Sequence, residues 1–146
     1  MGVDVKQTYR LYQALMRVTP ELASVDRTCT VKVAEGLPLR CDVLEVGKDF
    51  RRIALGHYWM LATGDQVPDV IFEICVFFDW ELAEAVSYHF GGRVEDAYPI
   101  DGEPPVLSIH RRINRLLERW LLLLAQQGYC MGTDAGSNVL PVLGSP

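Results

Sequence analysis

Residues 107–127 have the sequence LSIHRRINRLLERWLLLLAQQ, whose apolar residues recur at the three- and four-residue spacing of an amphipathic helix. Ser108 can cap the start of this helix, and Gly128 can adopt the left-handed conformation that ends helices. One arc of the helical wheel is apolar and is predicted to face the core: Ile109, Ile113, Leu116, Leu117, Trp120, Leu123 and Leu124. The sequence therefore predicts a long C-terminal helix that buries one face.

The opposite side of the same helix carries a stripe of arginines. We call it the arginine face, and it consists of Arg111, Arg112, Arg115, Arg119 and, at its end, Leu122. A row of guanidinium groups on a rigid helix can bind carboxylates or phosphates through paired hydrogen bonds. The alternative is an ordinary solvated helix face. Two observations favour binding: only Glu118 accompanies the four arginines, and Leu122 gains nothing from exposure to water.

Upstream of this helix the apolar pattern changes its period. Residues 4–18 have helical periodicity, with Asp4 as the N-cap. Apolar residues then alternate with polar ones in predicted strands at 28–33, 39–46, 51–61, 70–78 and 82–90. The alternation slips at Val43-Leu44, which indicates a bulge or a strand end. Residues 80–85 also contain good helix formers, so both a strand and a helix stay open for 80–90.

These elements predict an α+β fold. The order is a helix, about five strands with short connections, and a long helix. This order favours an antiparallel sheet with the N-terminal and C-terminal helices packed on one face. A loop at 93–105 connects the last strand to the long helix, and residues 1–130 are expected to form a single domain. Residues 131–146 are predicted to be a disordered tail, apart from the apolar stretch Val139–Leu143.

Composition disfavours several classes of protein. The formal charge of −5 gives no global attraction to nucleic acid or to anionic lipid. The longest uninterrupted apolar stretch, Trp120–Ala125, is far shorter than the ~18 residues that span a bilayer, and no secretory signal pattern is found. Cys29, Cys41, Cys75 and Cys130 form no CxxC pair, which disfavours a zinc site and indicates a reducing compartment. We expect a cytoplasmic protein without a metal or a cofactor.

Several positions in the loop and in the last helix match a known family. They are Asp96, Tyr98-Pro99, Ile113-Asn114, Leu117, Trp120-Leu121 and Gly128. On these residues the chain resembles the YqiB-like family, small bacterial proteins that are classed as a domain of unknown function. The likeness covers about residues 5–130, and the chain differs by a longer insertion at 99–105 and by its C-terminal tail. The family has no assigned activity, so the resemblance implies a cytoplasmic bacterial protein and transfers no catalytic residue.

One functional hypothesis is a small hydrolase or metal-dependent enzyme. His57 and His89 lie on predicted strands, and Asp79 and Glu84 lie at or near a turn. A fold that gathers these four side chains would form a pocket for acid–base chemistry. However, no HxH or HExxH spacing concentrates the histidines, and Ser87 is not part of a GxSxG motif. Surface or hydrogen-bonded side chains are the simpler explanation of these residues.

The leading hypothesis is a non-catalytic interaction or regulatory module. Its binding surface is the arginine face, and its partner is an acidic protein or a small anionic ligand. Leu122 and the apolar stretch Val139–Leu143 also permit a homodimer. The sequence alone thus favours binding over catalysis.

Overall fold

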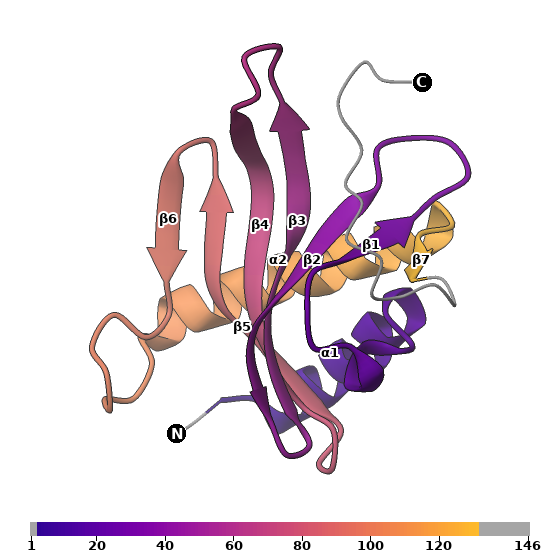
Figure 1. The fold of residues 1–146 in the computed structure, drawn as a ribbon. Helices are drawn as coiled ribbons and strands as arrows, with labels where there is room; N and C mark the ends of the chain where they lie inside the picture. Colours follow the sequence, from indigo (N-terminus) through magenta and orange to yellow (C-terminus); the bar gives the residue numbers. More distant parts are fainter. Residues whose placement is uncertain (1–2, 132–146) are drawn as a thin grey trace.

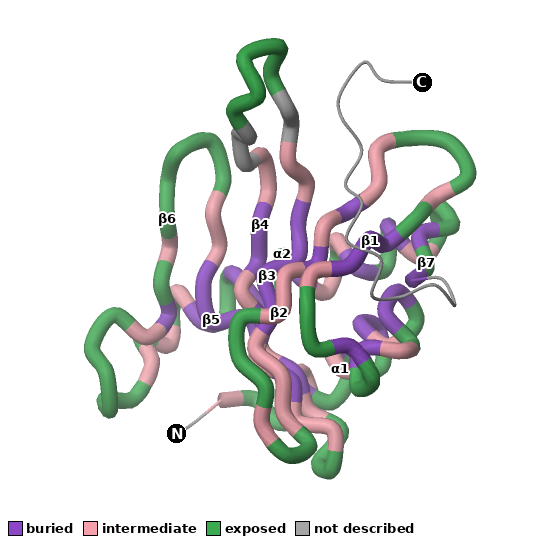
Figure 2. Tube along the Cα trace, viewed as in Figure 1, coloured by how far each residue is buried: buried purple, intermediate pink, exposed green. Residues whose placement is uncertain are grey.

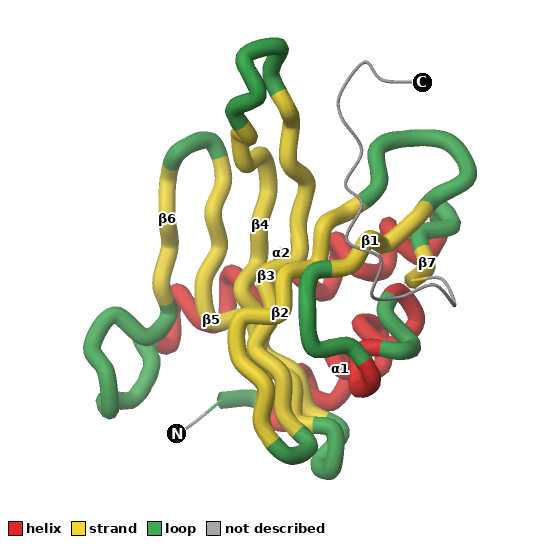
Figure 3. The backbone as a smooth tube through the Cα atoms, viewed as in Figure 1, coloured by secondary structure: helices red, strands yellow, loops and turns green. Residues whose placement is uncertain are grey.

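The computed structural model describes residues 3–131, except for the side chains at 59–60 and 66–68. Within residues 3–131 the chain forms two α-helices and a seven-stranded antiparallel sheet (Figure 1, Figure 3). The helices are α1 (Val5–Val18) and α2 (Leu107–Gln126), and a 3₁₀ turn, η1 (Leu22–Ser24), follows α1. The strands are β1 (Cys29–Lys32), β2 (Leu39–Gly47), β3 (Phe50–Met60), β4 (Gln66–Phe77), β5 (Leu82–Phe90), β6 (Arg93–Asp96) and β7 (Cys130–Met131).

The strands follow one another across the sheet in the order β6-β5-β4-β3-β2-β1-β7, and each pair of neighbours is antiparallel. The α+β class and the antiparallel sheet are confirmed, and residues 82–90 form a strand. The expected number of strands, about five, was too low. β6 lies in the predicted loop 93–105, and β7 lies where the predicted tail begins. β6 has only one apolar residue, Val94, and β7 has only two residues, so neither shows alternation in the sequence.

Two of the three residues that were predicted to begin or end a helix do so in the structure. Asp4 caps α1, because its carboxylate accepts hydrogen bonds from the N–H groups of Lys6 and Gln7. Gly128 ends α2 with a φ of 92°, as predicted. Ser108 is not the cap of α2, because the helix begins at Leu107 and its first turn has no side-chain cap. Of the tail predicted at 131–146, Met131 belongs to β7, and residues 132–146 lie outside the described residues.

A hydrophobic cluster joins both helices to the sheet. Figure 2 shows buried residues along the middle of the central strands and on one side of each helix, with exposed turns at the strand ends. The helices contribute Leu11, Leu15, Val18, Ile113, Leu117, Leu121 and Leu124. The strands contribute alternate residues, among them Val31, Cys41, Ile53, Leu55, Phe72 and Ile74. The register slip predicted at Val43-Leu44 is confirmed as a break in the β2–β3 pairing between residues 43 and 45.

The buried face of α2 is rotated from the predicted apolar arc. Leu116 and Leu123 were predicted to lie in the core, but they are 36% and 49% exposed. His110 and Asn114 are instead 1% and 0% exposed. A helical wheel that sorts residues by polarity alone predicts the wrong buried face for α2. A polar side chain can be buried at little cost in free energy when it finds hydrogen-bond partners.

Asn114 finds those partners on the edge of β5. Its Oδ1 accepts from the N–H of Ala85 at 2.7 Å, and its Nδ2 donates to the Ala85 carbonyl at 3.0 Å. The pairing of β5 with β6 ends at Ser87 and Asp96, so β6 does not reach Ala85. The carboxamide therefore takes the place of a neighbouring strand for one residue and fixes α2 against the sheet.

We expect Asn114→Leu to destabilise the protein. Leucine has a similar volume, but it would leave the N–H and C=O groups of Ala85 without partners, at a cost of about 1–3 kcal/mol each. The free energy of unfolding in a urea titration should fall by about 3 kcal/mol. Gln126→Leu, at the exposed end of the same helix, is the control and should change it by less than about 0.5 kcal/mol. Equal effects of the two substitutions would contradict the role of Asn114.

Candidate functional site

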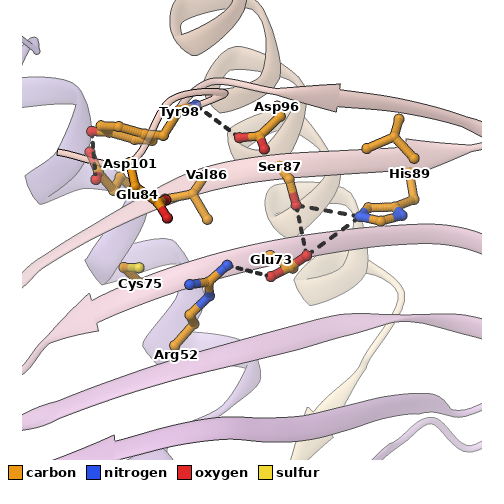
Figure 4. A pocket seen from close by; sticks show the side chains of 11 residues that line it. Arg52, Glu73, Cys75, Glu84, Val86, Ser87, His89, Asp96, Tyr98 and Asp101 are labelled. Atoms are coloured by element: carbon orange, nitrogen blue, oxygen red, sulfur yellow. Dashed lines mark hydrogen bonds and ion pairs between the residues drawn. The ribbon is translucent and has the colours of Figure 1, made fainter. Parts of the chain in front are cut away.

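A pocket of about 440 Å³ opens on one face of the sheet (Figure 4). Arg52 and Glu73 point into it, whereas their neighbours Ile53 and Ile74 belong to the hydrophobic cluster. Because successive side chains of a strand point to opposite faces, the pocket lies on the sheet face away from that cluster. It is lined by Arg52, Glu73, Cys75, Glu84, Val86, Ser87, His89, Val94, Asp96, Tyr98 and Asp101.

Cross-strand pairing places these side chains in rows. The first row crosses β3, β4 and β5 and contains Arg52, Cys75 and Glu84. The second row crosses β4, β5 and β6 and contains Glu73, Ser87 and Asp96. Directly opposed side chains on one face lie about 5 Å apart, so each row brings its polar groups within reach of one another.

A bulge in β5 brings the lining residues to one face. Simple alternation along the strand would put Glu84 on the face opposite to Ser87 and His89. The pairing of β4 with β5 shifts next to Glu73, and Val86 is the extra residue on β5. One extra residue reverses the phase of a strand, so Glu84 shares the face of Ser87 and His89.

Glu73 is the centre of a hydrogen-bonded group (Figure 4). Its Oε1 accepts from Arg52 Nη2 at 2.9 Å, and its Oε2 accepts from the Ser87 hydroxyl at 3.0 Å. Burial alone would raise the pKa of Glu73, but the hydrogen bonds from Arg52 and Ser87 outweigh it and hold that pKa below its usual value. The Glu73 carboxylate is therefore ionised at neutral pH and balances the charge of Arg52.

Glu84 is held between the loop after β6 and helix α2. The Tyr98 hydroxyl donates to Glu84 Oε1 at 2.9 Å, and His110 Nε2 lies 3.0 Å from Glu84 Oε2. Burial and the Glu84 carboxylate raise the pKa of Tyr98 far above its usual value, so the hydroxyl remains a donor. The N–H of Tyr98 donates to Asp96 Oδ1 at 2.8 Å. Tyr98 thus orients two carboxylates at the pocket.

Neither Ser87 nor Cys75 is arranged as a nucleophile. A serine–histidine relay needs the hydroxyl on one ring nitrogen and the orienting carboxylate on the other. Here Nε2 of His89 faces both groups, at 3.4 Å from the Ser87 hydroxyl and 3.5 Å from the Glu73 carboxylate. Burial and the charge of Glu84 raise the pKa of the Cys75 thiol to about 11, so it stays protonated at neutral pH. The pocket is better suited to binding than to covalent catalysis.

The four residues of the enzyme hypothesis do not come together. His89 and Glu84 line the pocket. His57 lies on the other face of β3, edge-on to Trp120 with 6.3 Å between ring centroids. Asp79 lies in the turn between β4 and β5, where its carboxylate accepts a hydrogen bond from the next backbone N–H. Strand alternation separates His57 from the pocket, and distance along the hairpin separates Asp79 from it.

The structure also adds residues that the sequence did not single out for this site. Among them are Arg52, Glu73, Cys75, Tyr98, Asp101 and, in contact with Glu84, His110. One signal for them is available in the sequence, because Glu73 is an acidic residue inside the apolar run 70–78. A carboxylate in such a run needs partners on neighbouring strands.

The arginine face is exposed on α2. The guanidinium of Arg112 forms an ion pair with Glu95 of β6. Among residues 3–131, no carboxylate lies within ion-pairing distance of Arg111, Arg115 or Arg119. These arginines therefore keep their hydrogen-bonding capacity for water or for a partner.

Leucines lie beside the arginines on the same side of α2. Leu122 is 41% exposed, and Leu116 and Leu123 are exposed because of the rotation of the helix. Glu118 does not neutralise the arginine face, because it pairs with Arg10 of α1 at 3.0 Å. The exposed surface of α2 is therefore both cationic and apolar.

Comparison with known proteins identifies a family. A family model described as "Protein of unknown function (DUF1249)" matches residues 14–130. The chain belongs to the DUF1249 family. The match begins within α1 and ends in β7, so it includes the pocket and the arginine face. Searches among curated proteins and among solved structures found no match.

The family confirms the expectation of a domain of unknown function, while the YqiB-like name and a bacterial origin stay predictions. In the described part of this DUF1249 protein, no helix is long and apolar enough to cross a membrane. Within the same residues, no group of three or more His, Cys, Asp or Glu side chains is placed to hold a metal ion.

We predict that His57 makes the DUF1249 protein less stable in mild acid. Burial lowers the pKa of His57 by more than Asp69 and the Leu37 carbonyl raise it. The unfolded chain, with a histidine pKa of about 6.5, then binds a proton more readily than the folded chain. The free energy of unfolding should therefore fall as the pH drops below about 6.5, and this loss should level off below the folded pKa.

Urea titrations at about pH 7.5 and about pH 5.5 measure this loss. His57→Gln cannot take up the proton and should lose less stability between the two conditions than the unsubstituted protein. Equal losses in the two proteins would show that another group is responsible.

Proposed function

We propose that this protein is a non-catalytic interaction module that binds an acidic protein through the arginine face of α2. The observation that carries the proposal is a helix surface on which exposed leucines lie beside Arg111, Arg115 and Arg119, which have no carboxylate within ion-pairing distance among the described residues. A guanidinium in water needs no partner, but an exposed leucine gains free energy only when it is covered. This combination fits a protein segment that carries both acidic and apolar side chains.

Helical spacing puts the charged and apolar groups within reach of a single partner. Arg115, Arg119 and Leu123 follow one another at four-residue intervals, so they lie along one ridge of α2. Leu116 follows Arg112 at the same interval on a neighbouring ridge. A partner could form paired hydrogen bonds between its carboxylates and the guanidinium groups while its apolar side chains cover the leucines.

A small anionic ligand and a second copy of this chain are the two alternative partners, and each fits only part of this surface. A small anionic ligand would use the arginines and leave the leucines in water. A two-fold homodimer through this surface would bring one arginine face against another, and the like charges would repel. An acidic protein of different sequence satisfies both the charged and the apolar parts.

We also propose that residues 1–130 act as a single domain in the cytoplasm. The support is the pair Cys29 and Cys41, which are direct neighbours across β1 and β2 and whose thiol groups are hydrogen-bonded to each other. Neighbouring thiols of this kind persist in a reducing compartment, whereas an oxidising one favours a disulfide.

Reversing the charge of Arg115 and Arg119 should abolish partner binding. A tagged Arg115→Glu/Arg119→Glu variant should lose at least about tenfold in affinity, because like charges replace two paired contacts. The measurement is recovery of the partner from the protein's own cell lysate, followed by mass spectrometry, at low and at high salt. The unsubstituted protein should retain an acidic partner at low salt and release most of it at high salt.

Arg17→Glu/Arg27→Glu is the matched control, because it changes the net charge equally at exposed positions outside α2. It should recover the partner normally, and both variants should keep the thermal unfolding midpoint. The Leu116→Gln/Leu123→Gln variant then distinguishes a protein partner from a small anion. It should weaken binding of a protein, which covers the leucines, and should not change binding of a small anion, which contacts only the arginines. Unchanged recovery with the arginine variant would refute the proposal.

A further inference from the structure

We propose that the pocket on the other face of the sheet binds a small organic cation that carries ammonium or guanidinium groups. This inference is independent of the arginine face. The floor of the pocket consists of β3, β4 and β5, and its wall consists of β6 and the loop that follows it (Figure 4). A volume of about 440 Å³ is in the range of pockets that hold organic molecules and far exceeds that of a bare ion.

The charges of the pocket select a cation. The guanidinium of Arg52 is already balanced by Glu73 at 2.9 Å. Glu84 contacts the ring of His110 at 3.0 Å. For Asp96 and Asp101, no lysine, arginine or histidine among the described residues lies within ion-pairing distance. Carboxylates that share a partly enclosed space repel one another, so a bound cation would lower their electrostatic energy.

The acceptors are held in place before any ligand arrives. Tyr98 orients Glu84 through its hydroxyl and Asp96 through its backbone N–H. The other oxygen of Glu84 contacts His110 Nε2 at 3.0 Å. Each carboxylate oxygen has two lone pairs, so one contact leaves it able to accept a further hydrogen bond. Fixed acceptors reduce the entropy that binding would otherwise lose. Val86 and Val94 complete the lining with apolar surface for the carbon part of a ligand.

The spacing of the acidic groups favours an organic cation over a metal ion. A metal ion needs several oxygen ligands that converge on one point. Among residues 3–131, no three or more potential metal ligands are grouped in this way. A molecule with separated N–H donors can instead bridge carboxylates that stand apart, as an amine or a guanidinium on a carbon chain does.

Isothermal titration calorimetry of the full chain with putrescine, spermidine and agmatine tests the proposal. Ionic strength is kept constant, and sodium chloride and magnesium chloride serve as inorganic probes. We expect saturable binding of at least one of the three amines and no saturable heat from either salt. Equal binding of magnesium would indicate an inorganic cation site and would overturn the proposal, as would the absence of binding by all three amines.

Two substitutions place the binding in the pocket. Asp101→Asn removes one charge from an exposed loop, and Asp96→Asn keeps an oxygen that can accept from the Tyr98 N–H. Each should weaken amine binding tenfold or more. Asp26→Asn, which removes the same charge at an exposed site outside the pocket, should leave the affinity unchanged. Equal affinities for all three variants would mean that the amines associate with the acidic surface in general.

Titration with a lysine-rich peptide tests whether the pocket binds a free amine or a lysine side chain of a protein. A lysine-rich peptide that binds while the three amines do not would replace the small molecule with a peptide partner and would overturn the proposal as stated. The Arg115→Glu/Arg119→Glu variant should bind the amines with unchanged affinity, because its substitutions lie on α2 outside the pocket. The test of the pocket and the test of the arginine face can therefore fail separately.

Discussion

The carboxamide of Asn114 is the constraint on which both candidate surfaces depend. Ala85 lies on the edge of β5 beyond the reach of β6, and its N–H and C=O groups are satisfied by this one side chain. Buried backbone groups need partners, so α2 has to present Asn114 to the sheet. Fixing one residue of a helix fixes the rotation of all the others. His110 is thereby turned inward onto Glu84, while the arginine face and Leu116 are turned outward.

The bulge at Val86 has a comparable effect on the pocket. It brings Glu84 to the face that carries Ser87, which regular alternation would not allow. The same irregularity leaves the Val86 carbonyl to accept a hydrogen bond from the N–H of Ala97 at 2.9 Å. Ala97 begins the loop in which Tyr98 orients the carboxylates. One extra residue therefore shapes the floor of the pocket and anchors its wall.

Periodicity alone was enough to predict the helices, the long strands and the antiparallel sheet, because burial imposes a period of about 3.6 or 2 on apolar residues. It failed where hydrogen bonds decide burial. Asn114 and His110 are polar yet buried, so the predicted arc of α2 was rotated away from the true one. The pocket was partly predicted, since Glu84 and His89 were named among its residues. Their common face depends on a register shift at Val86, which no local pattern in the sequence marks.

The two candidate surfaces carry opposite charges, and the net charge of −5 acts on them in opposite directions. The field of a negative chain attracts cations and so assists the approach of a cationic ligand to the pocket. The same field opposes the approach of an acidic partner, but salt screens it beyond about a Debye length, roughly 8 Å at physiological salt, so only the nearby arginines attract the partner at the surface of α2. The exposed ion pair of Arg112 with Glu95 contributes little at either surface. Charge can therefore steer a ligand to the pocket, whereas binding at α2 has to rely on close paired hydrogen bonds and on the burial of leucine.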